Sequence, residues 1–169
     1  MIVCGTGHRP DKLGGYSIEV INNLTQLASD WLREHKPTKV ISGMALGWDT
    51  ALASAAVSNE IPLVAAIPFR GQESRWPDES QKEFNRLTDK AQVIVYVSEG
   101  GYAPWKMQVR NKWMVDHADV VLALYNGDAS GGTYNCLEYA KKQQKQIVNL
   151  WETYVDLKER NLPHDRSGK

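Results

Sequence analysis

The residues best suited to bind a ligand lie in the segment from 126 to 133, which ends in Gly131, Gly132 and Thr133. Two adjacent glycines leave backbone amides open to a ligand, and the threonine adds a hydroxyl. An apolar run precedes the segment and an amphipathic one follows, so the glycines fall where a helix begins. Because unpaired N–H groups and the helix dipole favour anions at such a position, we predict that this loop holds a phosphate group. The alternative is a flexible glycine connector.

A second set of candidate ligand residues follows the first apolar run, in Thr6-Gly7-His8-Arg9-Pro10. Glycine lets the backbone approach a ligand closely, and the planar guanidinium of arginine matches the geometry of phosphate. We therefore predict that Thr6, Gly7 and Arg9 contact the ligand. A tight turn with a solvated arginine is the alternative interpretation.

The third candidate segment runs from Ser42 to Asp49 and also opens into a helix. It has neither the Gly-Lys-Ser/Thr of a P-loop nor the glycine pattern of dinucleotide-binding proteins. We include Gly43, Gly47 and Asp49 among the ligand-binding residues, while Asp49 has an equal claim to cap the helix. Trp48 is either a core residue or a platform for a base, and the core is favoured.

Arg110 joins the predicted site from the helix before the fifth apolar run, although a lone helical arginine is usually solvated. The four histidines, His8, His35, His117 and His164, show no paired spacing of metal ligands. No Ser-His-Asp arrangement can be assigned from spacing either. We therefore assign no catalytic residue, and we expect neither a metal nor a cofactor.

The elements that must position these residues alternate regularly along the chain. Parallel strands covered on both faces read as continuous apolar runs, and helices between them make the crossovers. This pattern predicts an α/β fold, a Rossmann-like three-layer sandwich with a mostly parallel sheet, which binds ligands beyond the carboxyl ends of its strands. The predicted strands are 2–4, 39–41, 63–67, 93–97, 120–124 and 147–150, and the predicted helices are 17–35, 49–58, 79–90, 107–117 and 132–145. We place one domain at 1–152, and a short helix and a tail, frayed from Pro163, at 153–169.

Composition limits the partners of the chain. Lys+Arg and Asp+Glu both number 20 in 169 residues, whereas proteins that follow a nucleic-acid backbone usually carry a positive excess, so we expect no nucleic-acid partner. Two cysteines, no signal-peptide pattern and no apolar run long enough to cross a bilayer predict a soluble, cytoplasmic protein without a membrane partner. Six tryptophans, with Trp76 and Trp105 placed in loops, predict a homo-oligomer, with a dimer as the first choice.

Several of these segments resemble the SLOG superfamily of Rossmann-like proteins. Residues 42–51 look like the matching loop of the DNA-processing protein of natural transformation. Residues 107–114, followed by Ala118-Asp119 and by residues 131–133, are similar to the lonely-guy phosphoribohydrolases. The opening residues 6–10 and the stretch 71–76 look most like the YpsA-like branch, and the resemblance covers about residues 1–150. It implies a nucleotide-type ligand at the glycine loops.

The chain also departs from both relatives at residues that carry their functions. In the lonely-guy enzymes, an arginine matching Arg110 and a glutamate three residues after the threonine serve hydrolysis of an N-glycosidic bond. Here that third residue is Cys136, and Glu138 comes two positions later, turned by about 200° on a helix. Leu46 stands where the DNA-processing proteins usually have arginine.

These departures set the order of three functional hypotheses. We favour binding of a nucleotide or a nucleotide-derived signal, either to sense it or to sequester it. A nucleoside-monophosphate phosphoribohydrolase is the first alternative, which the missing carboxylate weakens. A nucleic-acid-processing accessory protein is the second, which the neutral charge weakens.

Overall fold

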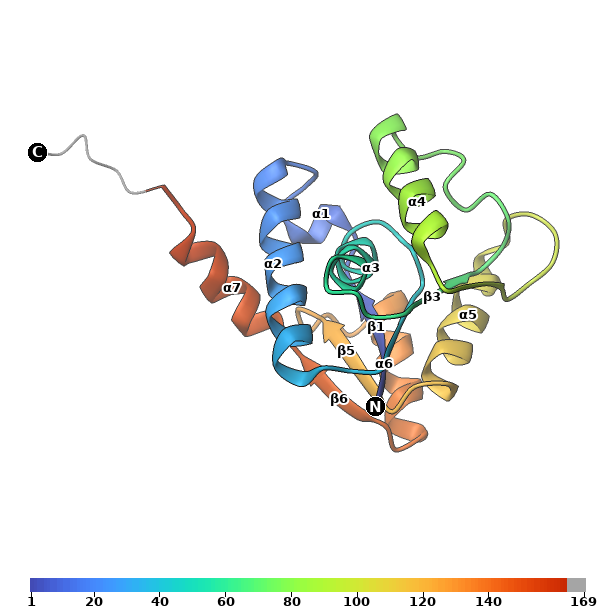
Figure 1. Ribbon diagram of the computed structural model, residues 1–169. Coiled ribbons are helices and arrows are strands. Elements are labelled where there is room, and N and C mark those ends of the chain that lie inside the picture. Colours follow the sequence, from blue (N-terminus) through green and yellow to red (C-terminus); the bar gives the residue numbers. More distant parts are fainter. Residues whose placement is uncertain (164–169) are drawn as a thin grey trace, which may run out of the picture.

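A computed structural model describes residues 1–163 and shows an α/β sandwich of three layers (Figure 1). Six parallel strands form the central sheet in the order β4-β3-β2-β1-β5-β6. The Rossmann-like fold predicted from the sequence is confirmed, with every strand pair parallel. The strands are β1 (Ile2–Gly7), β2 (Lys39–Ser42), β3 (Leu63–Ile67), β4 (Val93–Tyr96), β5 (Val120–Leu124) and β6 (Gln146–Asn149).

The strand order reverses direction between β1 and β5, which lie side by side at the centre of the sheet. Their pairing runs from Val3 opposite Val120 to Gly7 opposite Leu124, so both strands end at the same edge. The loops that follow them diverge to opposite sides of this switch point. In open α/β sheets, such a point is where the ligand crevice forms.

Helices cover both faces of the sheet. One face packs against α2 (Ile18–His35), α3 (Trp48–Ser58), α4 (Asp78–Lys90) and α7 (Trp151–Arg160), with the short α1 (Pro10–Leu13) at its edge. The other face packs against α5 (Pro104–Asp116) and α6 (Gly132–Lys142). Each face therefore has its own apolar core.

The longest helix follows its sequence signals closely. Ser17 caps α2 by accepting a hydrogen bond from the Val20 amide at 3.2 Å, and the helix ends at Lys36, whose φ of 48° is left-handed, just before Pro37. Leu24, Leu27 and Trp31 are buried beneath it, as their helical spacing predicts.

Three local differences from the sequence prediction have steric causes. The β1 strand continues through Gly5 and Gly7, and the missing side chains let α3 lie directly against it. A Cβ on Gly7 would be 2.6 Å from Cδ1 of Trp48, and one on Gly5 would be 2.5 Å from Cδ2 of Leu52. The α5 helix begins at Pro104, a favoured residue in a first turn, so Trp105 is helical and not in a loop.

The third difference is α1, which the sequence analysis did not include. It starts with Pro10 and closes on Gly14, whose φ of 107° suits glycine. At the other end of the chain, α7 buries Tyr154, whose hydroxyl donates to the Leu13 carbonyl at 2.7 Å. The predicted division at residue 152 stays a prediction, and residues 164–169 of the predicted tail lie outside the described residues.

Candidate functional site

A pocket of about 360 Å³ opens at the switch point, between the ends of β1 and β5 and the first turns of α3 and α6. We call it the switch-point pocket. The structure brings most of the predicted site residues together in its wall. Those that line it are Thr6, Gly7, Arg9, Asp49, Arg110, Gly131, Gly132 and Thr133.

The two remaining predicted residues, Gly43 and Gly47, are not among those that line the switch-point pocket. A Cβ on Gly43 would lie 2.6 Å from Cζ of Arg110, and one on Gly47 would lie 2.6 Å from the His8 carbonyl oxygen. Gly47 also has a φ of 90°, which other residues rarely adopt. Both glycines thus serve close packing of the loop that leads into α3.

The start of α6 is the part of the pocket most suited to an anion. Gly131, at the N-cap with a φ of 98°, has no side chain to cap the helix, so the first amides of α6 are left for another partner. A Cβ on Gly131 or Gly132 would meet no atom of the described chain within 4 Å. The space beside both glycines is therefore open, and both line the switch-point pocket, which suits a phosphate cradle.

Arg110 is held inside the protein, in contrast to the solvated side chain usual for a helical arginine. It is 4% exposed, and its Nη1 donates to the carbonyls of Gly43, at 2.5 Å, and Ala66, at 3.2 Å. Its Nε donates to Oδ1 of Asn111 at 2.9 Å. Burial lowers the pKa of Arg110, and the charge of Asp49 partly offsets this. The arginine thus ties the ends of β2 and β3 to α5 while also lining the pocket.

Asp49 occupies the first turn of α3 but does not cap the helix in the way the sequence suggested, because Gly47 stands at the N-cap. Its Oδ2 accepts a hydrogen bond from the Ala45 amide at 3.3 Å, and the side chain lines the switch-point pocket while only 7% of the residue is exposed. Burial raises the pKa of the Asp49 carboxyl, and Arg110 is the main opposing influence.

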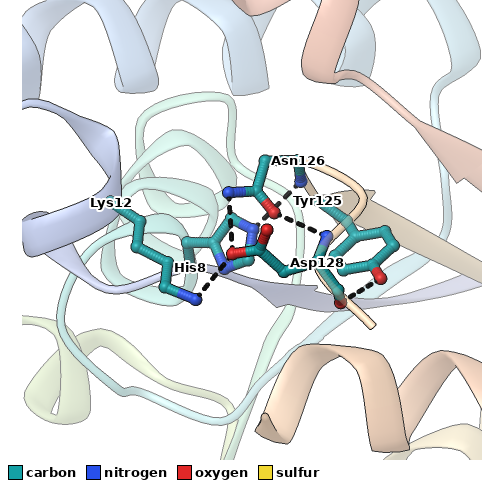
Figure 2. Close-up of polar contacts among 5 residues, drawn as sticks. All are labelled: His8, Lys12, Tyr125, Asn126 and Asp128. Carbon is teal, nitrogen blue, oxygen red and sulfur yellow. Dashed lines mark hydrogen bonds and ion pairs between the residues drawn. The ribbon is translucent and has the colours of Figure 1, made fainter. Parts of the chain in front are cut away.

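Two pocket residues that sequence reasoning did not select are His8 and Lys12. Figure 2 shows Lys12 reaching Oδ2 of Asp128 at 3.0 Å, and the backbone amide of Asn126 donating to Nε2 of His8 at 3.0 Å. These contacts fasten the loop after β5 to the loop after β1. Burial lowers the pKa of His8. The sequence analysis did not include α1, the helix that carries Lys12, and so it could not assign Lys12 to the pocket. That Lys12 lies three residues after Arg9 was a signal that could have indicated a pocket position.

The remaining sequence interpretations near the pocket can also be placed. Trp48 is fully buried and donates from Nε1 to the Leu122 carbonyl at 3.2 Å, so the core assignment is confirmed. Glu138 is not among the residues that line the pocket and pairs with Lys141 at 3.1 Å. Cys136 is buried, which raises its pKa to about 11 and keeps the thiol neutral. Residues 1–163 contain no group of three or more metal-ligating side chains suited to a metal ion.

The all-parallel sheet, its switch-point pocket and the glycine-led α6 define a Rossmann-like protein. The chain belongs to the YspA SLOG family, whose model matches residues 3–158, and the resemblance seen in the sequence is thereby confirmed. It is 30% identical over 155 residues to the uncharacterized SPbeta prophage-derived protein YoqJ of Bacillus subtilis, covering 82% of this chain and 90% of that one.

Solved structures extend the likeness at the level of fold. DNA processing protein A from Streptococcus pneumoniae superposes with a TM-score of 0.64 and 17% identity, over 94% of this chain and 54% of that one. The molybdenum cofactor binding protein from Rippkaea orientalis superposes with a TM-score of 0.57 and 17% identity, over 95% and 86% of the two chains. None of the helices in the described part of the chain is long and apolar enough to span a membrane.

Proposed function

We propose that the switch-point pocket binds a nucleotide or a nucleotide-derived ligand, and that the protein senses or sequesters that ligand. The observation that carries the proposal is the start of α6, which has no side-chain cap and lines a pocket together with two exposed cations, Arg9 and Lys12, the second of which pairs with Asp128. A phosphate placed there would receive backbone hydrogen bonds and would be attracted by both side chains.

The dimensions and the surroundings of the pocket support the same proposal. Its volume of about 360 Å³ falls in the range of small-molecule sites. The molybdenum cofactor binding protein, which shares the fold, binds a small molecule by its name, and this supports a small-molecule ligand here. The cytoplasm stays the proposed location, since Cys4 and Cys136 are buried free thiols.

The test is titration calorimetry with adenosine monophosphate. We expect Gly132→Val to abolish binding, because the added side chain would fill the space in front of the α6 amides without striking protein atoms. Gly101→Val is the matched control, since Gly101 also has open space around it and does not line the pocket. Unchanged affinity in Gly132→Val would remove the phosphate from this site.

Hydrolysis of nucleoside monophosphates is the second candidate, and the carboxylate of Asp49 in the pocket wall is the observation in its favour. We nevertheless expect little or no release of adenine from adenosine monophosphate. Glu138, the carboxylate nearest in sequence to the lonely-guy position, is bonded to Lys141 and is not part of the wall. Chromatography of the reaction mixture checks this. Robust turnover that disappears in Asp49→Asn would replace the binding proposal with the hydrolase.

Two proposals about partners accompany the main one. Nucleic acid is a possible partner by fold, because DNA processing protein A shares it, but the neutral net charge makes a small molecule the better proposal.

We also propose self-association. The outer face of α5 carries Trp105, 60% exposed, and Val109, 40% exposed, while its inner face holds Lys106, Arg110 and Asn111. A second copy of the chain is the occupant we propose for this outer face.

A further inference from the structure

We propose that Asp49 recognises the hydroxyl groups of a ribose, so that the switch-point pocket selects ribose phosphates over their 2-deoxy counterparts. This inference rests on the proposed function and adds the chemical class of the ligand. The juxtaposition that points to it is a buried carboxylate in the wall of a pocket whose other parts favour an anion.

The first step is the state of the Asp49 side chain. Oδ2 accepts from the Ala45 amide at 3.3 Å, whereas Oδ1 has no hydrogen-bond partner within residues 1–163. No fully enclosed side-chain oxygen in that part of the chain lacks a partner, so Oδ1 keeps access to the pocket. Asp49 as a whole is only 7% exposed, and a carboxylate so largely removed from solvent is costly to bury unless its oxygens accept hydrogen bonds.

The second step is the charge that the pocket offers at its different walls. Arg9, Lys12 and the start of α6 attract negative charge, while the buried Asp49 and the exposed Asp11 repel it. A ligand with phosphate at every end would place one group against the carboxylate. A ligand with one phosphate and a set of donors elsewhere satisfies both parts of the wall.

The third step is the identity of those donors. An ionised carboxylate only accepts hydrogen bonds, so it binds hydroxyl or amino groups. A nucleotide offers both, as the ribose hydroxyls and the exocyclic amine of some bases. In dinucleotide-binding Rossmann folds one acidic side chain binds the ribose 2′-hydroxyl, and by analogy we assign such a role to Asp49, in the first turn of the helix after β2. The sugar is therefore the source to which we commit, and the base is an outcome of the test.

Neighbouring positive charge supports an ionised Asp49 in this role. Arg110 lies buried beside it and Arg9 stands at the mouth of the pocket, and both favour the charged form against burial. The Ala45 contact alone does not require a carboxylate, because one amide oxygen can accept the same hydrogen bond. Asp49→Asn therefore separates a role in ligand binding from a role in holding the loop.

The experiment measures binding of four probes by calorimetry: inorganic phosphate, ribose 5-phosphate, 2-deoxyribose 5-phosphate and adenosine monophosphate. We expect the wild-type protein to bind ribose 5-phosphate about tenfold or more tightly than the 2-deoxy sugar, the loss expected for one charge-assisted hydrogen bond. Asp49→Asn should abolish that preference without weakening the binding of inorganic phosphate, because it removes a negative charge from the pocket wall. Asp89→Asn, an exposed carboxylate on α4, is the control and should behave as wild type.

Each contrary result has a distinct meaning. Equal affinity for the two sugars, or a preference that survives in Asp49→Asn, overturns the ribose assignment while the phosphate site stands. If Asp49→Asn weakens only adenosine monophosphate and neither sugar phosphate, the base is the donor and the ribose assignment is wrong. If none of the four probes binds to the wild-type protein, the proposed function fails together with this inference. Thermal unfolding of each variant is the check that the variant is folded.

Discussion

Arg110 both lines the switch-point pocket and holds carbonyls inside the protein, whereas the exposed Arg9 only lines the pocket. Arg110→Ala would remove the side-chain donor that reaches the carbonyls of Gly43 and Ala66, and Gln72 would remain as a donor to Gly43 alone. We expect a loss of about 2 kcal/mol or more in the free energy of unfolding, because buried hydrogen bonds would be lost and the buried Asp49 would lose its neighbouring positive charge. Denaturant unfolding measures this, and Arg110→Lys should recover only part of it.

Arg9→Ala is the variant with which the stability of Arg110→Ala is compared. Arg9 is exposed, so its removal should leave unfolding unchanged and weaken phosphate binding by about tenfold to a hundredfold. Equal stability of the Arg110→Ala and Arg9→Ala proteins would contradict the structural role of Arg110.

His8 predicts a dependence of stability on pH. Burial lowers its pKa in the folded protein below the ordinary value of 6.5, so the unfolded chain binds the proton more readily. The contribution of His8 to stability is therefore complete above about pH 6.5 and declines as the pH falls toward the folded pKa. Protonation of Nε2 would also break its hydrogen bond with the Asn126 amide.

The measurement is thermal unfolding at about pH 7.5 and about pH 5.5, where an ordinary histidine changes charge. We expect His8→Asn to lose less stability than wild type between these two conditions. His117→Asn is a suitable control, because His117 is exposed at the end of α5. If the stability of wild type and of His8→Asn depends on pH in the same way, the titration of His8 does not contribute to stability.

At the scale of elements, the sequence predicted the strands and the longer helices because their apolar periodicity is strong. The loops that it selected line the switch-point pocket, since the order of strands and helices brings β1 and β5 together and the glycines stand at the start of α6. The parts that it did not predict depend on tertiary contacts. Gly5 and Gly7 look like strand breakers, yet they sit inside β1 because Trp48 and Leu52 press against them.

The α5 helix shows most clearly why the site was only partly predictable. In its first two turns the polar Lys106 and Arg110 are buried and the apolar Trp105 and Val109 are exposed, whereas Met114 and Val115 near its end are buried as usual. A pattern rule would turn the first part of the helix the other way, because it buries the apolar side. The interior is polar there because Arg110 must reach the carbonyls at the ends of β2 and β3. Sequence alone does not reveal that the sheet presents those carbonyls.

At the scale of the whole molecule, the same inversion predicts that copies of the chain associate. We expect light scattering at micromolar concentration to give the mass of a dimer or a larger assembly, because Trp105 and Val109 would otherwise stay in contact with water. Trp105→Glu should shift the mass toward that of one chain. Asn85→Glu, which adds the same charge at an exposed position on α4, is the control. A monomer mass for the wild-type protein would reject self-association.

The contact between α7 and α1 limits how far the chain can be shortened from its C-terminal side. Tyr154 donates to Leu13, the last residue of the short helix that begins directly after Arg9 and contains Lys12. The ring of Trp151 also meets the edge of His8, with ring centres 5.8 Å apart. A fragment trimmed to end before α7 would keep every residue that lines the pocket and still lose the support beneath its cationic side. Shortened versions and C-terminal fusions are therefore best designed with the entire last helix retained.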